Sequence, residues 1–457
     1  MRKLRNRNRL ACAVTAALGI TCCGIGTHVR AAEPTDSGLS LTPASVRAIY
    51  ADVPNQGPGS PATGPSGTAE APGSSAPTPP PQATTPPRKP LMRVMDAIGI
   101  GKGLDDLGIN IYGWVEGSYT YSASAPPGNI ITGRVFDLTH EDPTLNQVDL
   151  NFEKTVDLTK KEWQWGFHIE GLYGADAGGI HALGLFDWYD GRFNPENQFD
   201  LVQAYADIGI PIGNGLQLRL GKWVTLLGQE VINPTGNALF SHSYLFGFAI
   251  PFTHTGVLGT YAFNDQFTLD LGVTRGWDVS LEDNNSALDY IGRVTWTLPD
   301  KKNKIFATLI SGPEQTGNDG RWRTVFDLIW TYQATDALSF AVNGDYGFDS
   351  GASPTGGDAM WYGVAAYMGY KFNDYATLNL RGEFFRDEDG VRLGTGFGTN
   401  VYEATAGVTV TPFASDEIMQ NLKIRPEVRF DYSENKIFDA GTDRYQFTAG
   451  IDAYFTF

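Results

Sequence analysis

Residues 108 to 457 alternate between apolar and polar side chains with a period of two, and this alternation restricts the fold more than any other feature. In the last segment, Phe447 and Ile451 fall on one face, whereas Gln446 and Asp452 fall on the other. Successive side chains of a β-strand point to opposite faces of its sheet, whereas a helix repeats every 3.6 residues. The region is therefore predicted to be all-β.

Segments with this alternation recur along the whole region. They span residues 109–121, 145–156, 162–174, 199–210, 215–227, 252–263, 266–276, 287–298, 303–312, 322–333, 337–348, 360–372, 376–387, 401–412, 421–432 and 444–457. A tilted strand of about 9–11 residues crosses the hydrocarbon core of a bilayer. We therefore expect about sixteen membrane-crossing strands, with 14 and 18 as the alternative counts.

The connections between these segments alternate in length, which favours a membrane barrel over a soluble sandwich. The short connections lie near residues 157–161, 211–214, 264–265, 299–302, 334–335, 373–375 and 413–420. The long connections lie near residues 122–144, 175–198, 228–251, 277–286, 313–321, 349–359, 388–400 and 433–443. Outer-membrane barrels have short periplasmic turns and longer outer loops.

Aromatic residues gather beside the short connections, on the apolar face of the segments. They are Trp163, Trp165, Phe263, Phe267, Trp296, Trp330, Tyr332, Phe372, Phe455 and Phe457. Such a girdle is typical of a membrane interface. The last segment ends at the aromatic Phe457, and we expect the barrel-assembly machinery to recognise this end.

Strands survive in hydrocarbon only when the sheet closes on itself, because each unpaired backbone amide costs several kcal/mol there. The fold class predicted is therefore a transmembrane, antiparallel, up-and-down β-barrel surrounded by outer-membrane lipid. Sixteen strands also leave a water-filled lumen, whereas eight would be filled by side chains.

Residues 1–32 resemble a secretory signal peptide, with a basic start, a short apolar stretch and small residues around Ala31 and Ala32. Cleavage near either alanine would export the chain to the bacterial outer membrane. A membrane anchor is the alternative, but the apolar stretch is short. All three cysteines lie in this segment, and Thr21 before Cys22 does not favour a lipoprotein site. The mature chain is thus expected to contain no disulfide.

Two further segments precede the barrel. Residues 33–90 are rich in Pro, Gly and Ser and are predicted to form a disordered arm, either a spacer or a contact with the cell wall or a partner. Residues 91–107 have apolar residues near helical spacing, which indicates a short amphipathic lead-in helix. The barrel itself is assigned to residues 108–457.

Charge and motifs exclude several classes of function. The formal net charge is −17, so no nucleic acid partner is expected. His168 and Glu170 share one face of the third segment, but no nucleophile motif accompanies them. No histidine pair has metal-ligand spacing, and no cofactor motif is present. We therefore predict that the chain is not an enzyme and binds neither cofactor nor metal.

The polar faces of the segments should line the pore, where charges sort ions by sign. The residues expected there are Glu116, Glu170, Arg219, Lys222, Arg293, Arg323, Asp327, Arg381, Glu383, Arg425, Glu427 and Arg429. Asp207, Asp270 and Asp345 share these polar faces. The alternative role for any one of these residues is an internal salt bridge that braces the wall.

The long connection 228–251 is weakly charged for a loop that faces water. We expect it to fold inward as a constriction, with an outer lid as the alternative. Its polar residues Glu230, Asn233, Asn237 and His242 are the expected constriction residues.

Three segments resemble a known family. They are NIYGWVEGSYTY at 110–121, LRLGKWVTLLGQEVINP at 218–234 and HTGVLGTYAF at 254–263. They are similar to the OmpL-like outer-membrane β-barrel porin-2 family of Gram-negative bacteria. The resemblance covers nearly all of residues 108–457 and implies a porin, with no catalytic residues to carry over.

The function expected is a porin-like channel for passive diffusion of ions and small hydrophilic solutes. The alternative is a structural or adhesive barrel that contacts the cell wall or other cells. By analogy with general porins of sixteen strands, a homotrimer is expected.

Overall fold

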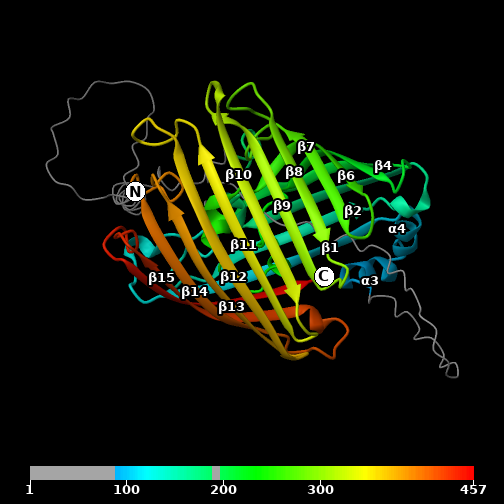
Figure 1. Cartoon of the computed structure of the whole chain (residues 1–457). Coiled ribbons are helices and arrows are strands. Elements are labelled where there is room, and N and C mark those ends of the chain that lie inside the picture. The colour runs from blue at the N-terminus through cyan, green and yellow to red at the C-terminus, as the bar shows by residue number, and fades with distance from the viewer. Residues whose placement is uncertain (1–87, 188–195) are drawn as a thin grey trace, which may run out of the picture.

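The computed structural model describes residues 88–187 and 196–457. The predicted signal peptide and all but the last residues of the Pro-rich arm lie outside the described residues. The described chain forms one closed antiparallel barrel in which each strand pairs with its neighbours in sequence (Figure 1).

Sixteen strands build the barrel, as predicted. They are β1 (Asn110–Ser122), β2 (Thr144–Lys154), β3 (Gln164–Gly174), β4 (Gln198–Ile210), β5 (Leu216–Val224), β6 (Thr253–Ala262), β7 (Phe267–Thr274), β8 (Asp289–Thr297), β9 (Asn303–Gln315), β10 (Asn318–Gln333), β11 (Leu338–Asp349), β12 (Ala359–Asn373), β13 (Ala376–Asp387), β14 (Thr399–Val410), β15 (Leu422–Ser433) and β16 (Tyr445–Thr456).

The predicted long connection at 313–321 is wrong. Strands β9 and β10 continue to Gln315 and Asn318, which pair directly, and the register shifts between Asn318 and Trp322. Gly317, with a φ of 68°, supplies the left-handed conformation of this tight turn. The polar residues of this segment resemble those of a loop. A strand that extends beyond the hydrocarbon core of the membrane does not need an apolar face.

The barrel closes where β1 pairs with β16. The last residue completes the seam, because the Phe457 N–H donates to the Gly113 carbonyl at 2.9 Å and the Gly113 N–H donates to the Phe457 carbonyl at 3.0 Å. The Phe457 ring covers the bare Cα of Gly113: a Cβ there would lie 2.9 Å from the ring and 2.1 Å from the Asp149 carbonyl oxygen.

The two faces of the sheet differ as the alternation predicted. Outward residues such as Val115 and Phe430 are exposed to the surroundings of the barrel, whereas inward residues such as Glu116 and Arg429 are buried. The predicted girdle residues Trp163, Trp165 and Phe372 lie on the outer face. A second set of exposed aromatics lies near the long loops: Tyr121, Tyr173, Phe199, Tyr290, Trp322, Tyr346, Tyr402 and Tyr445.

Two short helices, α3 (Pro90–Ala97) and α4 (Gly101–Leu107), lie where a single lead-in helix was expected. The chain turns between them at Gly99, where φ is 86°. Met92 is buried against β1, and its sulfur accepts a hydrogen bond from the Ile111 N–H at 3.4 Å. Neither helix, nor any other helix in the described ranges, is long and apolar enough to cross a membrane.

The interior at the long-loop end contains a hydrophobic core. Loop residues such as Phe136, Phe246 and Phe438 pack in one cluster with the inward-facing strand residues Trp361 and Phe385. These side chains fill a part of the lumen that sixteen strands alone would leave to water. The barrel is therefore polar on its inner wall but apolar where its long loops meet inside it.

Gly113, at the seam between β1 and β16, allows closure of the barrel to be tested. We expect Gly113→Ala to reduce the fraction of folded barrel, because the new Cβ would collide with the Asp149 carbonyl and displace Phe457. Gly117→Ala is the matched control, since its nearest neighbour is the Thr144 carbonyl at 3.4 Å. Folding is measured by the migration of unheated protein in SDS gels. Equal folding of the two variants would contradict this role of the seam.

Candidate functional site: a loop that crosses the barrel

The segment 225–252, which we call the crossing loop, connects β5 to β6 and lies inside the barrel. It contains a 3-10 turn, η4 (Pro234–Gly236), and one turn of π-helix, η5 (Leu245–Ala249). Every residue of η5 is buried. The apolar part of this weakly charged loop therefore contributes to the interior core.

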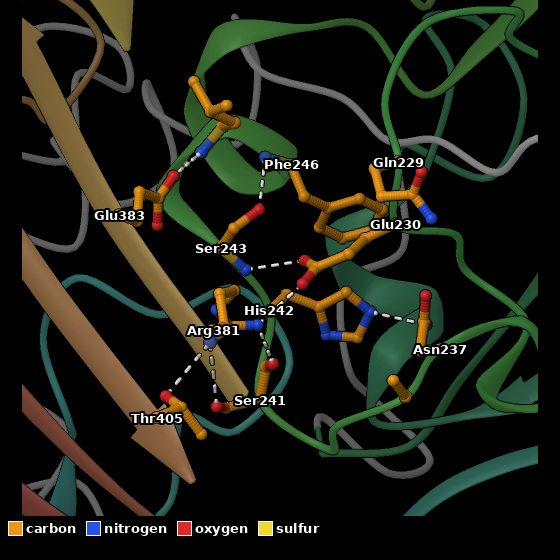
Figure 2. Close-up of polar contacts among 12 residues, drawn as sticks. Gln229, Glu230, Asn237, Ser241, His242, Ser243, Phe246, Arg381, Glu383 and Thr405 are labelled. Carbon is orange, nitrogen blue, oxygen red and sulfur yellow. Dashed lines mark hydrogen bonds and ion pairs between the residues drawn. The ribbon is translucent and has the colours of Figure 1, made fainter. Parts of the chain in front are cut away.

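The crossing loop reaches the wall opposite its own strands. It begins at β5, yet many of its polar contacts lie on β13 and β15, and β13 is eight strands from β5 in the closed order of sixteen. Figure 2 shows the loop beside β13, with the Arg381 and Glu383 side chains pointing toward it.

Arg381 joins the crossing loop to the wall through its guanidinium (Figure 2). Its Nη1 donates to Glu230 Oε1 and to the Ser241 carbonyl, each at 2.6 Å, and its Nε donates to Glu403 Oε2 at 3.0 Å. The guanidinium is fully buried between a carboxylate of the loop and a carboxylate of β14. A buried ion pair is maintained only with such complete hydrogen bonding, since desolvation of each charge costs several kcal/mol.

Wall carboxylates also accept backbone N–H groups of the loop. Glu383 accepts from Tyr244 and Leu245, each at 2.7 Å. Glu427 accepts from Phe240 at 2.8 Å and Ser241 at 3.1 Å. These bonds satisfy backbone donors that the irregular loop cannot pair internally.

Two arginines of β15 bind the loop's carbonyl groups. Arg425 Nη1 donates to the carbonyls of Pro234 and Asn237 at 2.9 and 2.8 Å, while its Nη2 pairs with Asp452 at 2.6 Å and Glu116 at 3.2 Å. Arg429 Nη1 donates to the His242 carbonyl. The wall therefore recognises both donors and acceptors of the loop backbone.

His242 holds the loop's own fold. Its Nε2 lies 3.1 Å from both Asn237 Nδ2 and the Val231 carbonyl, and its ring packs against Phe136 and Phe246 with centroids 4.9 and 4.3 Å apart. Burial lowers the pKa of His242 to about 4, although the nearby Glu230 opposes this shift. The imidazole is therefore neutral in the docked loop near neutral pH. Burial raises the pKa of Glu230, but the Arg381 guanidinium and the hydrogen bond from the Ser243 N–H outweigh this effect, so the pKa is lowered.

A stacked arginine holds the π-helical turn under the outer loops. The Arg392 guanidinium lies 5.0 Å from the Trp277 ring and 4.9 Å from the Trp361 ring, and its Nε donates to the Phe248 carbonyl at 2.6 Å. Trp361 Nε1 donates to the Ala249 carbonyl at 2.9 Å. Cation–π contacts of a desolvated guanidinium are worth about 2 kcal/mol.

The wall near the start of the loop differs from the opposite wall. The Arg219 and Arg293 side chains keep 24% and 18% exposure, against 0% for Arg381 and 2% for Arg425. Arg219 pairs with Asp207 at 3.0 Å, and Arg293 pairs with Asp270 at 3.1 Å. The accessible arginines of the inner wall thus lie along β5 and β8.

An interior cavity of about 220 Å³ adjoins the loop on the short-turn side. Glu230, Asn237, Thr331, Ser339, Tyr367 and Asn379 are among the residues that line it. Its lining mixes these polar groups with apolar side chains such as Leu239, Phe340 and Met368.

The structure brings together one group of the predicted residues. Arg381, Glu383, Arg425, Glu427 and Arg429 meet Glu230, Asn237 and His242, and Glu116 joins them through Arg425. Asn233 instead accepts a hydrogen bond from Thr235 within its own turn.

Other predicted residues lie apart from this group. Lys222 pairs with Asp200, Arg323 with Asp349, and Glu170 accepts from Gln203. Asp327 touches only the start of the loop, where it accepts from the Gly228 N–H at 3.3 Å. No group of three or more His, Cys, Asp or Glu side chains in the described part of the chain is placed to hold a metal ion.

Sequence reasoning missed several partners. Glu403, Asp431 and Asp452 complete the ion pairs of Arg381, Arg429 and Arg425. All three lie on the buried, polar face of their strands, so the alternation carried a signal for them. Arg134, in the loop after β1, pairs with Asp137 and Asp431, and no periodicity marks it.

The Arg381 contact makes a mutational test. We expect Arg381→Met to destabilise the docked loop by roughly 3–5 kcal/mol, because Glu230 and Glu403 would be left buried without their cation. Hydrogen exchange of residues 229–244 should then be faster. Arg386→Met is the control, since the Arg386–Glu388 pair keeps 22% and 32% exposure. Unchanged exchange in Arg381→Met would contradict the anchoring role.

His242 predicts a dependence on pH. Because the pKa of His242 in the docked loop is about 4, a released loop takes up a proton as pH falls from about 6.5 toward 4 while the docked loop does not. Docking should therefore weaken over this window and be constant above it. His242→Gln, which cannot titrate there, should show a smaller change in hydrogen exchange of residues 229–244. Identical pH profiles would contradict this assignment.

Comparisons with known proteins agree with this barrel architecture. The chain matches the family described as "Putative beta-barrel porin-2, OmpL-like" over residues 108–457. No curated relative matches the sequence significantly.

Solved outer-membrane proteins share the fold at low identity. The anion-selective porin from Comamonas acidovorans is 11% identical, with a TM-score of 0.53, and covers 76% of this chain and 99% of its own. OprB from Pseudomonas putida is 12% identical, with a TM-score of 0.51, and covers 79% and 97%. The family match spans the whole barrel, and the chain belongs to the OmpL-like β-barrel porin-2 family.

Proposed function

We propose that the barrel is an outer-membrane channel for passive diffusion of ions and small hydrophilic solutes, in which the crossing loop narrows the pore. The family and the fold are those of a channel rather than an enzyme. The observation that carries the role of the loop is its set of buried bonds to Arg381, Glu383 and Glu427 inside the barrel.

The path for solutes is proposed to run past the accessible arginines of β5 and β8, on the short-turn side of the core residues Trp223 and Ile291. Two facts support it: the loop is bound to the opposite wall, and Arg219 and Arg293 keep accessible side chains. Both arginines are paired with carboxylates, so the path presents neighbouring positive and negative groups to a passing ion. The remaining predicted pore residues would then act as anchors of the loop or braces of the wall.

Several further expectations belong to this proposal. A signal peptide cleaved near Ala31 or Ala32 would export the chain in a Gram-negative cell, and the assembly machinery would read the end of β16 at Phe457. The exposed apolar outer face supports contact with outer-membrane lipid. A homotrimer is proposed by analogy with other porins of sixteen strands.

A structural or adhesive barrel is the second candidate, favoured by the hydrophobic core that fills the long-loop end. Conduction separates the two. The purified protein should form channels in planar bilayers, whereas a plugged scaffold would not.

Replacing residues 229–244 by a short Gly-Ser linker should raise the conductance of a single channel, because the linker lacks the side chains that fill the lumen. Shortening residues 354–357, which are exposed, is the control and should change nothing. Unaltered conductance after the first replacement would contradict the role of the loop. If neither the parent protein nor the variant with shortened residues 354–357 conducted ions, the proposal that the barrel is a channel would be contradicted.

A further inference from the structure

A pair of carboxylates on the inner wall is left without the partners that its burial requires. Asp327 of β10 and Asp345 of β11 face each other across the strand pair and are only 2% and 4% exposed. Neither forms an ion pair with a basic side chain in the described part of the chain. A buried charge without a partner is expensive, so two adjacent ones need compensation.

The hydrogen bonds of the pair are incomplete. Asp327 Oδ2 accepts from Asn343 Nδ2 at 2.7 Å and from the Gly228 N–H at 3.3 Å. Asp327 Oδ1 and both oxygens of Asp345 are buried and receive no hydrogen bond from a donor group, and the two carboxylates lie close enough to interact directly with each other. Three carboxylate oxygens are therefore unsatisfied at one place.

A neutral oxygen on the next strand points to the same place. Thr308 of β9 pairs directly with Asp327, is 3% exposed, and its Oγ1 has no hydrogen-bond partner. Directly paired residues of antiparallel strands bring their Cβ atoms to about 4.5–5.5 Å. An unpaired buried hydroxyl beside an unpaired carboxylate indicates that both face a common ligand, since they do not bond to each other.

The basic side chain that is paired with Thr308 on the neighbouring strand already has a carboxylate partner. Arg293 pairs with Thr308 across β8 and β9, but its Nε donates to Asp270 Oδ2 at 3.1 Å. Glu383, from β13, is the other charged group near Asp345, and its two oxygens accept backbone N–H groups of the crossing loop. No ion pair among the described residues thus compensates the charge of the Asp327–Asp345 pair, and Arg293 acts on Asp327 only from a distance.

We infer that Thr308, Asp327 and Asp345 form a binding site for a hard divalent cation such as Ca²⁺. All of the unsatisfied atoms are oxygens, which is the ligand type that Ca²⁺ prefers, and two carboxylates neutralise its charge. The cation would join β9, β10 and β11 beneath the start of the crossing loop, where Asp327 and Asn343 accept from Gly228 and Gln229. Binding to this site does not require conduction, so the inference stands or falls separately from the channel.

Calorimetric titration of Ca²⁺ into the chelator-treated, full-length barrel in detergent tests the site. We expect binding that Asp345→Asn and Thr308→Val each weaken at least ten-fold. Asp349→Asn is the matched control: it removes the same charge from a buried inner-wall carboxylate, but one whose oxygens accept from Arg323 and Gln315. Its affinity should equal that of the parent protein.

Folding of each variant is checked by its heat-modifiable migration. Equal Ca²⁺ affinity in the parent and in folded Asp345→Asn would overturn the site. So would an infrared band of a protonated carboxyl that persists in excess Ca²⁺ and is absent from Asp345→Asn, because the pair would then be compensated by a shared proton.

Discussion

Backbone hydrogen bonding is the constraint on which this structure depends. A strand in hydrocarbon has no water to satisfy its amides, so the sheet must close. Closure is completed by the last residue, whose amide and carbonyl both pair with Gly113. Once the sheet is closed, its period of two assigns every second side chain to the interior, and the charged residues placed there must find partners.

The crossing loop meets the same requirement by different means. It has no strand to pair with, so its amides bond to Glu383 and Glu427 and its carbonyls bond to Arg381 and Arg425. The charged residues of β13 and β15 therefore do not act mainly as an open lining of the pore. They hold a loop whose apolar half completes the core at one end and whose polar half borders a cavity at the other.

The sequence predicted the features that depend on local periodicity. Strand number, the faces of the strands and the placement of most connections follow from alternation alone. The β9–β10 turn was missed because strand outside the hydrocarbon, at Gln315 and Asn318, carries polar residues like those of a loop. Gly99 divided the lead-in segment into two helices although its neighbours keep helical spacing.

Partnerships across the barrel could not be predicted in this way. Arg381 and Glu230 are 151 residues apart, and which carboxylate meets which guanidinium depends on how the loop lies in three dimensions. Only the low charge of the crossing loop indicated, indirectly, that it folds into the barrel. Arg134 and Arg392 had no such signal, because each lies in a loop outside the alternating segments and contacts residues that are distant in the sequence.

The crossing loop is held against β13 to β15, and we propose that this arrangement leaves a path for solutes along β5 to β8. Because all three cysteines lie at positions 12, 22 and 23, in the segment expected to be removed, introduced cysteines report on this claim directly. Single-channel current is measured while a charged, water-soluble thiol reagent is added to Gln217→Cys or to Thr405→Cys. We expect the reagent to reduce the current through Gln217→Cys and to leave the current through Thr405→Cys unchanged. Reduction of the current only in Thr405→Cys would contradict this proposal.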